Sequence, residues 1–208
     1  MNIDPHDYSE TFIAEDSVKS AARARGVENG VTDVSQGTGA YLRQLAHQIK
    51  AQSVVEIGTG SGVGSLWLLE GMLSSGTLTS IDDEMEHSSI AKIALIEADI
   101  AQPRYRLITN SVMDVMTKLT DRAYDLVVFR HNPEDLSFAI SEAHRILRSG
   151  GVFVIDNFFG GGKVPDPAQR DPKTVALREA GKLIKGDTDS WMTSLAPIGD
   201  GLLLATKL

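Results

Sequence analysis

The stretch that decides the fold is "VVEIGTGSGVGS", which runs from Val54 to Ser65. Its first four residues are apolar apart from Glu56 and predict a buried strand, and a loop with a glycine at every second position follows directly. Because glycine has no side chain, such a loop lets the backbone approach a ligand closely, and the helix that begins after it adds free N–H groups. The stretch therefore predicts a ligand site at the carboxyl end of a strand.

Two common phosphate-binding motifs do not fit this loop. A dinucleotide-binding loop needs its third glycine at position 63, which is Val63, and no Gly-Lys-Ser/Thr sequence of a P-loop is present. Two carboxylates accompany the glycines instead, since Glu56 precedes the first glycine and Asp82 ends the next predicted strand. Asp82 suits ribose hydroxyls, and Glu56 suits a cationic amino group such as that of S-adenosylmethionine.

The segments on either side of this loop predict the rest of the sheet. From Ser53 onward, β-rich segments alternate with helical patterns, which predicts a parallel sheet covered on both faces. The predicted strands span residues 53–57, 77–81, 104–109, 124–129 and 151–156. A helix follows from an Asp171 cap to about Lys185, and two strands around "GDG" then predict an antiparallel hairpin. The predicted fold is an α/β three-layer sandwich with a seven-stranded, mostly parallel sheet.

The first 50 residues predict two helices, at about Tyr8–Arg25 and Thr38–Lys50, with Ser35 or Gln36 as the cap of the second. The polar segment "GVENGVTDVSQG" between them is either a lid over a site or a plain connection. No linker divides the chain, so residues 1–208 are expected to form a single domain. Residues 1–50 would form part of a lid or dimer surface, and residues 53–208 would form the core.

Composition limits the classes of partner. Apolar residues make up 42% of the 208 positions, which is enough for a core, and no apolar segment has the length of a membrane span. The net charge of −8 argues against a large nucleic-acid interface. The chain has no cysteine, and its acidic beginning is unlike a signal peptide. We therefore expect a cytoplasmic protein that binds a small molecule, without nucleic-acid or membrane partners.

These motifs resemble the S-adenosylmethionine-dependent O-methyltransferases of the catechol and caffeoyl-coenzyme-A type, above all small actinobacterial proteins provisionally assigned to that activity. The resemblance extends from "EDSVKSAARARG" through the glycine loop to "PIGDGLLLATK". It implies a class I methyltransferase fold, methyl transfer to a small-molecule hydroxyl, and a homodimer. The cofactor-binding residues that it implies are Val34, Glu56, Gly58, Thr59, Gly60, Gly64, Ser65, Asp82, Asp83, Ser111, Val112 and Met113.

The resemblance also assigns roles within this set. Glu56 would hold the amino group of S-adenosylmethionine, Asp82 its ribose, and residues 111–113 would border its adenine. Val34 would pack near the methionyl part. Relatives often have serine or threonine where this chain has Gly64, and the neighbouring Ser65 is a candidate replacement.

The segment "FRHNP", Phe129–Pro133, departs from the family pattern. Metal-dependent relatives have "IDADK" there, with a metal-binding aspartate where this chain has Arg130 and a lysine base where it has Pro133. The family's other two metal ligands remain as Asp156 and Asn157. Two oxygen ligands beside a permanent cation make a poor magnesium site, so we expect no divalent metal and expect Arg130 to pair with Asp156. Arg130 would then either hold an anionic substrate or form a structural salt bridge.

Arg130 and His131 are the predicted catalytic residues. His131 is a candidate general base because histidine titrates near neutrality, although a rim position without a catalytic role is the alternative. The predicted substrate pocket contains Arg130, Asp156, Asn157 and Phe158, and Phe158 either lines the pocket or packs under the loop that follows.

Three other functions stay open at this stage. The Asn132-Pro133 pair partly matches a signature of amino-methyltransferases, but Asn132 is better explained as a helix cap. A cofactor-binding protein without turnover is a second alternative. A nicotinamide oxidoreductase is a third, and Val63 and the terminal hairpin argue against it.

Overall fold

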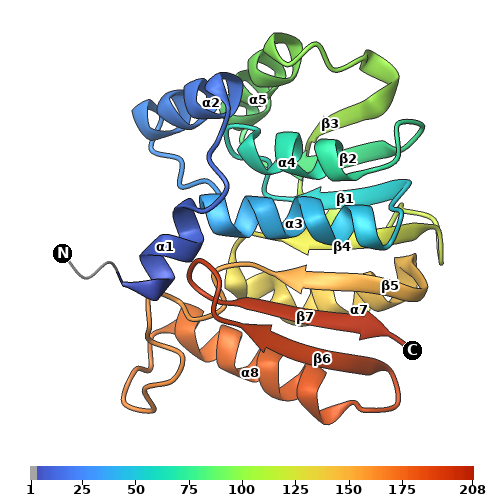
Figure 1. The fold of residues 1–208 in the computed structure, drawn as a ribbon. Coiled ribbons are helices and arrows are strands. Elements are labelled where there is room, and N and C mark those ends of the chain that lie inside the picture. The colour runs from blue at the N-terminus through green and yellow to red at the C-terminus, as the bar shows by residue number, and fades with distance from the viewer. Residues whose placement is uncertain (1–3) are drawn as a thin grey trace.

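The computed structural model describes residues 4–208, which form one seven-stranded sheet in the order β3-β2-β1-β4-β5-β7-β6 (Figure 1). The first five strands in this order are parallel, and β7 lies antiparallel between β5 and β6. The strands are β1 Ser53–Ile57, β2 Thr77–Asp82, β3 Tyr105–Thr109, β4 Tyr124–Phe129, β5 Leu147–Ile155, β6 Trp191–Ala196 and β7 Leu202–Lys207. This topology confirms the predicted class I methyltransferase fold.

Helices cover both faces of the sheet, with α3 in front of it and α7 behind it in Figure 1. The described helices are α1 Pro5–Thr11, α2 Ser17–Glu28, α3 Gln36–Gln48, α4 Val63–Gly71, α5 Met85–Glu97, α6 Val112–Met116, α7 Leu136–Ile146 and α8 Pro172–Gly186, with short 3₁₀ helices η1 Gln102–Arg104 and η2 Pro133–Asp135. Within the described residues, no helix is both long and apolar enough to cross a membrane.

The sheet separates two apolar cores because successive side chains of a strand point to opposite faces. In β5, Phe153 packs with α6, α7 and α8, whereas Val152 and Val154 pack with α2, α3, α4 and α5. β4 divides its side chains in the same way, and all of its last four residues are buried. Burial on both faces explains why these strands are almost continuously apolar.

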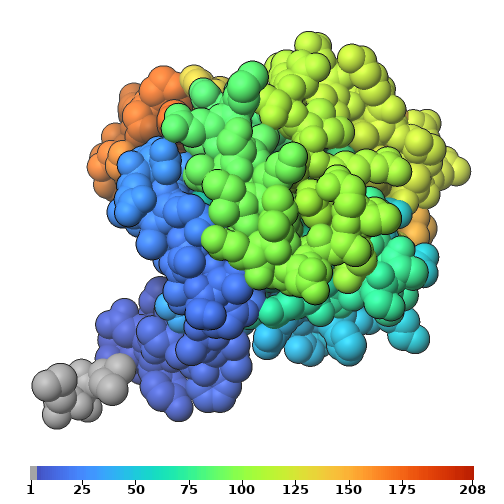
Figure 2. All heavy atoms as spheres, turned by 90° about the horizontal axis from the view of Figure 1, so that it is seen from above, coloured from blue at the N-terminus to red at the C-terminus, as the bar shows by residue number. Residues whose placement is uncertain are grey.

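The N-terminal region differs from the prediction of one helix over Tyr8–Arg25. The structure has α1 and α2 with a break between them, and Asp16 caps α2 by accepting hydrogen bonds from the N–H groups of Val18 at 3.0 Å and Lys19 at 2.9 Å. An aspartate side chain stabilises a helix start more than a helix interior, which accounts for the break. α2 then lies against α5, where an Arg25–Glu97 ion pair joins them at 2.7 Å (Figure 2).

Other predicted boundaries are close to those observed. Ser35 caps α3, and Asp171 caps α8 by accepting a hydrogen bond from the N–H of Thr174 at 3.1 Å. Asn132 caps η2, so the helix after β4 begins with a 3₁₀ turn. β5 begins at Leu147 rather than at residue 151, because Leu147 already pairs with Tyr124 of β4.

Phe153→Ala should destabilise the fold strongly, because Phe153 is fully buried at the centre of the sheet. We expect a loss of about 3–5 kcal/mol in the free energy of unfolding, measured by urea denaturation with circular dichroism. Met192→Ala on the edge strand β6 is the matched control, since Met192 is 62% exposed, and should change it by less than about 0.5 kcal/mol. Equal effects of the two substitutions would contradict this view of the core.

Candidate active site

The glycine loop lies at the carboxyl end of β1, where Gly58, Gly60 and Gly62 all adopt positive φ angles. A Cβ atom on Gly58 would collide with the backbone oxygen of Arg130, and one on Gly60 would approach the side chains of Arg130 and Asp33. Only glycine combines this conformation with this packing. The loop therefore exposes bare backbone at the end of the strand, as the sequence predicts.

Asp82 fixes this loop from the end of β2. Its Oδ2 accepts a hydrogen bond from the N–H of Gly60 at 3.1 Å, and its Oδ1 accepts one from Glu84 at 3.0 Å and contacts Nδ1 of His87 at 3.0 Å. The side chain is buried. The contact between His87 and Asp82 is not predicted from the sequence. The only indication of it is that His87 lies five positions after Asp82, in the helix that follows β2.

A cavity of about 280 Å³, here called the glycine-loop cavity, lies between these elements and the N-terminal loop. Its lining residues are Gly30, Val31, Thr32, Gly58, Gly60, Asp82, Asp83, His87, Arg130 and His131. The volume is slightly below the roughly 300–1,000 Å³ that is typical of ligand sites. Residues 30–32 of the segment 29–35 form one side of this cavity.

Glu56 is buried behind the glycine loop and does not line that cavity. The hydroxyls of Ser65 and Ser80 both donate hydrogen bonds to its Oε2, the second at 2.7 Å. Burial raises the pKa of Glu56 to about 7, although the two serines and Arg130 oppose this shift. A Cβ on Gly64 would collide with Oε1 of Glu56, so the glycine provides space for this carboxyl group.

The remaining predicted cofactor residues differ in how deeply they are buried. Thr59 is buried, and its hydroxyl lies 2.7 Å from that of Ser80. Val34 is also buried. Its Cγ1 atom lies 3.8 Å from the position that a Cβ on Gly64 would take. The segment 111–113 follows β3, the neighbour of β2, with its serine as the cap of α6. It lines none of the cavities described here, so its contact with adenine stays a prediction.

Arg130 does not pair with Asp156, and that expectation is wrong. Its Nη1 donates a hydrogen bond to the backbone oxygen of Thr32, and its Nη2 lies 3.8 Å from Oδ1 of Asp33. Asp33 in turn accepts hydrogen bonds from the N–H and the hydroxyl of Ser61, at 3.1 and 2.6 Å. The segment 29–35 is therefore tied both to the residue after β4 and to the glycine loop.

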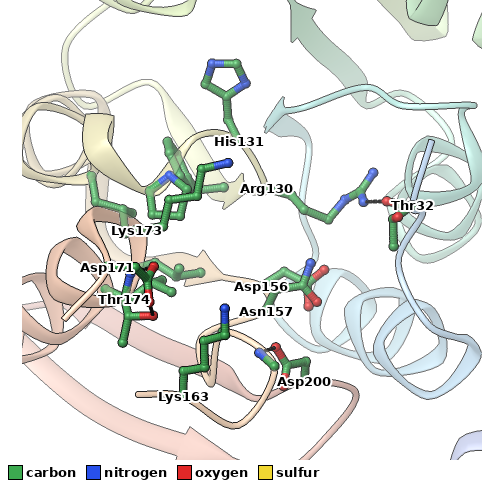
Figure 3. A pocket seen from close by; sticks show the side chains of 17 residues that line it. Thr32, Arg130, His131, Asp156, Asn157, Lys163, Asp171, Lys173, Thr174 and Asp200 are labelled. Atoms are coloured by element: carbon green, nitrogen blue, oxygen red, sulfur yellow. Dashed lines mark hydrogen bonds between the residues drawn. The ribbon is translucent and has the colours of Figure 1, made fainter. Parts of the chain in front are cut away.

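A larger cavity of about 620 Å³, here called the Asp156 cavity, opens on the other side of Arg130 (Figure 3). Asp156 is 5% exposed, and its Oδ2 has no hydrogen-bond partner within residues 4–208. Burial raises the pKa of Asp156, and the nearby guanidinium of Arg130 opposes the shift. A buried acceptor without a partner is costly in a native protein, so this oxygen is a candidate ligand contact.

The predicted substrate residues do not all lie in this cavity. Arg130, Asp156 and Asn157 line it, but Phe158 is 6% exposed and packs against Gly181 of α8. Phe158 is thus placed under the loop, the second of its two predicted positions. Four charged lining residues from the loop after β5, the start of α8 and the hairpin are not among the predicted pocket residues: Lys163, Asp171, Lys173 and Asp200.

His131 lies where the two cavities meet. Together with Thr32 and Arg130 it lines both of them. Its Nε2 lies 3.7 Å from Oδ2 of Asp83 and 3.6 Å from Oδ2 of Asp135. The imidazole therefore lies beside two carboxylates. It belongs to the wall that borders both the glycine-loop cavity and the Asp156 cavity.

The residues present do not fit a divalent metal. Asp156 and Asn157 supply oxygens, but the third family position carries the cation of Arg130. Over residues 4–208, no three histidine, cysteine or acidic side chains gather in a way that could hold a metal ion. Magnesium needs several oxygen ligands in near-octahedral geometry, and this set does not supply them.

Comparison with known proteins agrees with the family that the sequence resembles. A family model described as O-methyltransferase matches residues 6–208. A protein of Mycobacterium sp. (strain JLS), provisionally assigned as an O-methyltransferase, is 44% identical over 200 residues, covering 96% of this chain and 90% of the relative.

Solved structures agree with this match. A protein of Corynebacterium glutamicum is 30% identical with a TM-score of 0.89, covering 96% of this chain and 94% of that one. The O-methyltransferase TomG of Streptomyces achromogenes, involved in tomaymycin synthesis and crystallised with S-adenosylmethionine, is 27% identical with a TM-score of 0.85, covering 96% and 93%.

The stability of the protein should depend on pH through Glu56. Its pKa is about 7 in the folded chain against an ordinary value of 4.5, so the folded form binds the proton more tightly. The resulting stability is fully present below pH 4.5 and is lost as the pH rises through about 7. Between pH 5 and 8, the free energy of unfolding should therefore fall by about 2 kcal/mol more than in Glu56→Gln. Denaturant titrations of both proteins, with the exposed Glu179→Gln as control, measure this difference, and parallel pH profiles would contradict it.

Replacing Arg130 should release the segment Asn29–Ser35. Arg130→Met keeps the length of the side chain but removes the charged hydrogen bond to Thr32, which is worth about 1.5–3 kcal/mol. Amides of the segment should then exchange with deuterium about tenfold faster or more, as mass spectrometry can measure. Arg148→Met is the matched control, since Arg148 pairs with Asp125 at 2.6 Å away from both cavities. Unchanged exchange in Arg130→Met would show that other contacts hold the segment.

Proposed function

The chain belongs to the O-methyltransferase family and is an S-adenosylmethionine-dependent enzyme, and we propose that it methylates a hydroxyl of a small molecule without a divalent metal. The observation that carries this proposal is the meeting of two cavities at Arg130 and His131. One cavity has the features of a nucleoside site, and the other is large enough for a small acceptor.

The glycine-loop cavity fits the cofactor. Its floor is backbone without Cβ atoms, and the carboxylate of Asp82 lies in its wall with lone pairs left for ribose hydroxyls. Glu56 lies behind the loop, where an ionised carboxylate would attract the methionyl amino group. Movement of the segment Asn29–Ser35 would enlarge the cavity, because Val31 and Thr32 of this segment form part of its wall.

When bound, S-adenosylmethionine supplies a methyl group on a sulfonium ion, and the protein contributes mainly alignment. The Asp156 cavity would hold the acceptor so that its hydroxyl faces the shared wall. His131 would take the proton of that hydroxyl, since its imidazole can act as a base and lies where the two cavities meet. The free Oδ2 of Asp156 would accept a hydrogen bond from a hydroxyl of the acceptor.

Arg130 would act as the fixed cation of the site in place of a metal ion. Its guanidinium is permanently charged and lies close enough to Asp156 to oppose the rise of that group's pKa. It donates a hydrogen bond to Thr32 and forms an ion pair with Asp33, so its main role would be to keep the segment 29–35 beside both ligands.

We also propose that the enzyme acts in the cytoplasm as a homodimer. The acidic composition and the absence of cysteine support the first statement. The family resemblance supports the second. Asn132 argues against the amino-methyltransferase alternative, because its side chain caps η2 instead of facing an acceptor amine.

Assays of methyl transfer test the proposal directly. Phenols, catechols and hydroxylated acids should be offered to the enzyme with S-adenosylmethionine, and release of S-adenosylhomocysteine should be measured with magnesium and with chelator. We expect turnover of at least one compound at a rate that neither addition changes, because the site offers too few oxygen ligands for magnesium.

Two outcomes would contradict this view in different ways. Strong dependence on magnesium would show that Asp156 and Asn157 recruit a metal despite Arg130. Cofactor binding by calorimetry without transfer to any compound would favour a binding protein that lacks turnover.

A further inference from the structure

Two lysines line the Asp156 cavity without an ion-pair partner in the described chain. Lys163 lies in the glycine-rich loop after β5, and Lys173 lies in the first turn of α8. Their amino groups point into the cavity from two different elements (Figure 3). Within residues 4–208, the lysines that do form ion pairs are Lys19 and Lys182. The wall of the cavity therefore contains two lysine amino groups in addition to Arg130.

The acidic residues near these lysines are hydrogen-bonded to other groups, although Asp171 also interacts electrostatically with Lys163. Asp171 accepts hydrogen bonds from the N–H and the hydroxyl of Thr174, at 3.1 and 2.7 Å. Asp200 accepts one from the N–H of Gly161 at 2.6 Å. These carboxylates fix the start of α8 and the loop after β5, which are the elements that present the two lysines.

Arg130 is less suited to bind an anion than the lysines are. Its guanidinium is held by the backbone oxygen of Thr32 and by the carboxylate of Asp33. An anion bound there would compete with the carboxylate of Asp33 for the same guanidinium group. The lysine amino groups have three donors each and no such commitment.

Asp156 adds a hydrogen-bond acceptor to the same cavity. It is buried, its Oδ2 lacks a hydrogen-bond partner, and it lines the same space as the lysines. A carboxylate in that position repels an anion and attracts a hydrogen-bond donor. Within the described residues, the cavity thus offers an unpartnered oxygen at Asp156 and two amino groups at Lys163 and Lys173, which lie on different elements of its wall.

We propose that the acceptor is a small hydroxylated molecule with a carboxylate or phosphate group, which Lys163 and Lys173 bind while its hydroxyl faces Asp156. This inference rests on the proposed methyl transfer and adds the class of acceptor and its orientation. Lysine binds both anions as a point charge, and the two are distinguished by experiment.

Three matched catechols test the inference: protocatechuate, the neutral protocatechuyl alcohol, and the phosphate monoester of that alcohol. Their KM values should be compared in the natural enzyme, in the double variant Lys163→Ala/Lys173→Ala, and in Lys185→Ala as a control elsewhere on α8. We expect the double variant to raise the KM of at least one anion about tenfold, or ~1.4 kcal/mol. The KM of the alcohol should stay within about twofold in the double alanine variant. The double variant Lys163→Arg/Lys173→Arg keeps both charges and should retain the lower KM for the anion. The anion with the larger loss identifies the group that the subsite takes.

A binding measurement separates this inference from the proposed function. Calorimetry of the same compounds with the protein loaded with S-adenosylhomocysteine detects the anion subsite whether or not any compound is methylated. The anion should bind more tightly than the alcohol. The difference in affinity between them should become smaller at high salt and in the double variant Lys163→Ala/Lys173→Ala. Equal affinity for anions and alcohol, or an unchanged preference in the double variant, would overturn the inference. Failure of methyl transfer with this pattern intact would count against the proposed reaction alone.

Discussion

The close contact between β1 and β4 at their carboxyl ends is the constraint on which the site depends. The N–H of Arg130 donates a hydrogen bond to the backbone oxygen of Ile57 at 2.8 Å, and the backbone oxygen of Arg130 occupies the space where Gly58 would carry a Cβ. The chain therefore leaves β4 directly against the glycine loop. This contact gives the two cavities a common wall, because the same two residues after β4 border both of them.

A fixed cation at this wall differs physically from a metal ion. A metal ion can be exchanged and accepts lone pairs from the acceptor, whereas a guanidinium is permanent and donates hydrogen bonds in a plane. Arg130 donates a hydrogen bond to Thr32 and forms an ion pair with Asp33, and so connects the N-terminal segment to the end of β4. At the position where metal-dependent relatives have an aspartate ligand, this chain thus has a side chain that joins the segment 29–35 to the end of β4.

Much of the fold follows from local sequence patterns. The glycine loop, the apolar strands and the caps at Ser35 and Asp171 each have a short-range signal, and the structure confirms them. The break before α2 is not predicted, because an aspartate within a helical pattern is equally typical of a polar position on the helix surface. The early start of β5 depends on pairing between Leu147 and Tyr124, which no local pattern encodes.

The candidate site was less predictable because its contacts join distant segments. Arg130 and Thr32 are 98 positions apart, and the conformation of the loop at Thr32 decides their contact. Lys163 lies in an irregular loop, so periodicity gives no indication of where its side chain points. Glu56 was correctly predicted at the end of β1, but its burial depends on the hydroxyls of Ser65 and Ser80 from two other elements.

The burial of Glu56 links ligand binding to proton uptake and release. With a pKa of about 7, this group is divided between its neutral and ionised forms near neutrality. A cation that binds beside it favours the ionised form, so binding expels a proton into the solvent. The heat of such a reaction includes the ionisation heat of the buffer, and its apparent affinity falls as the medium becomes more acidic. Occupancy of the proposed cofactor site would thus depend on proton activity through Glu56 as well as through the α-amino group of the methyl donor.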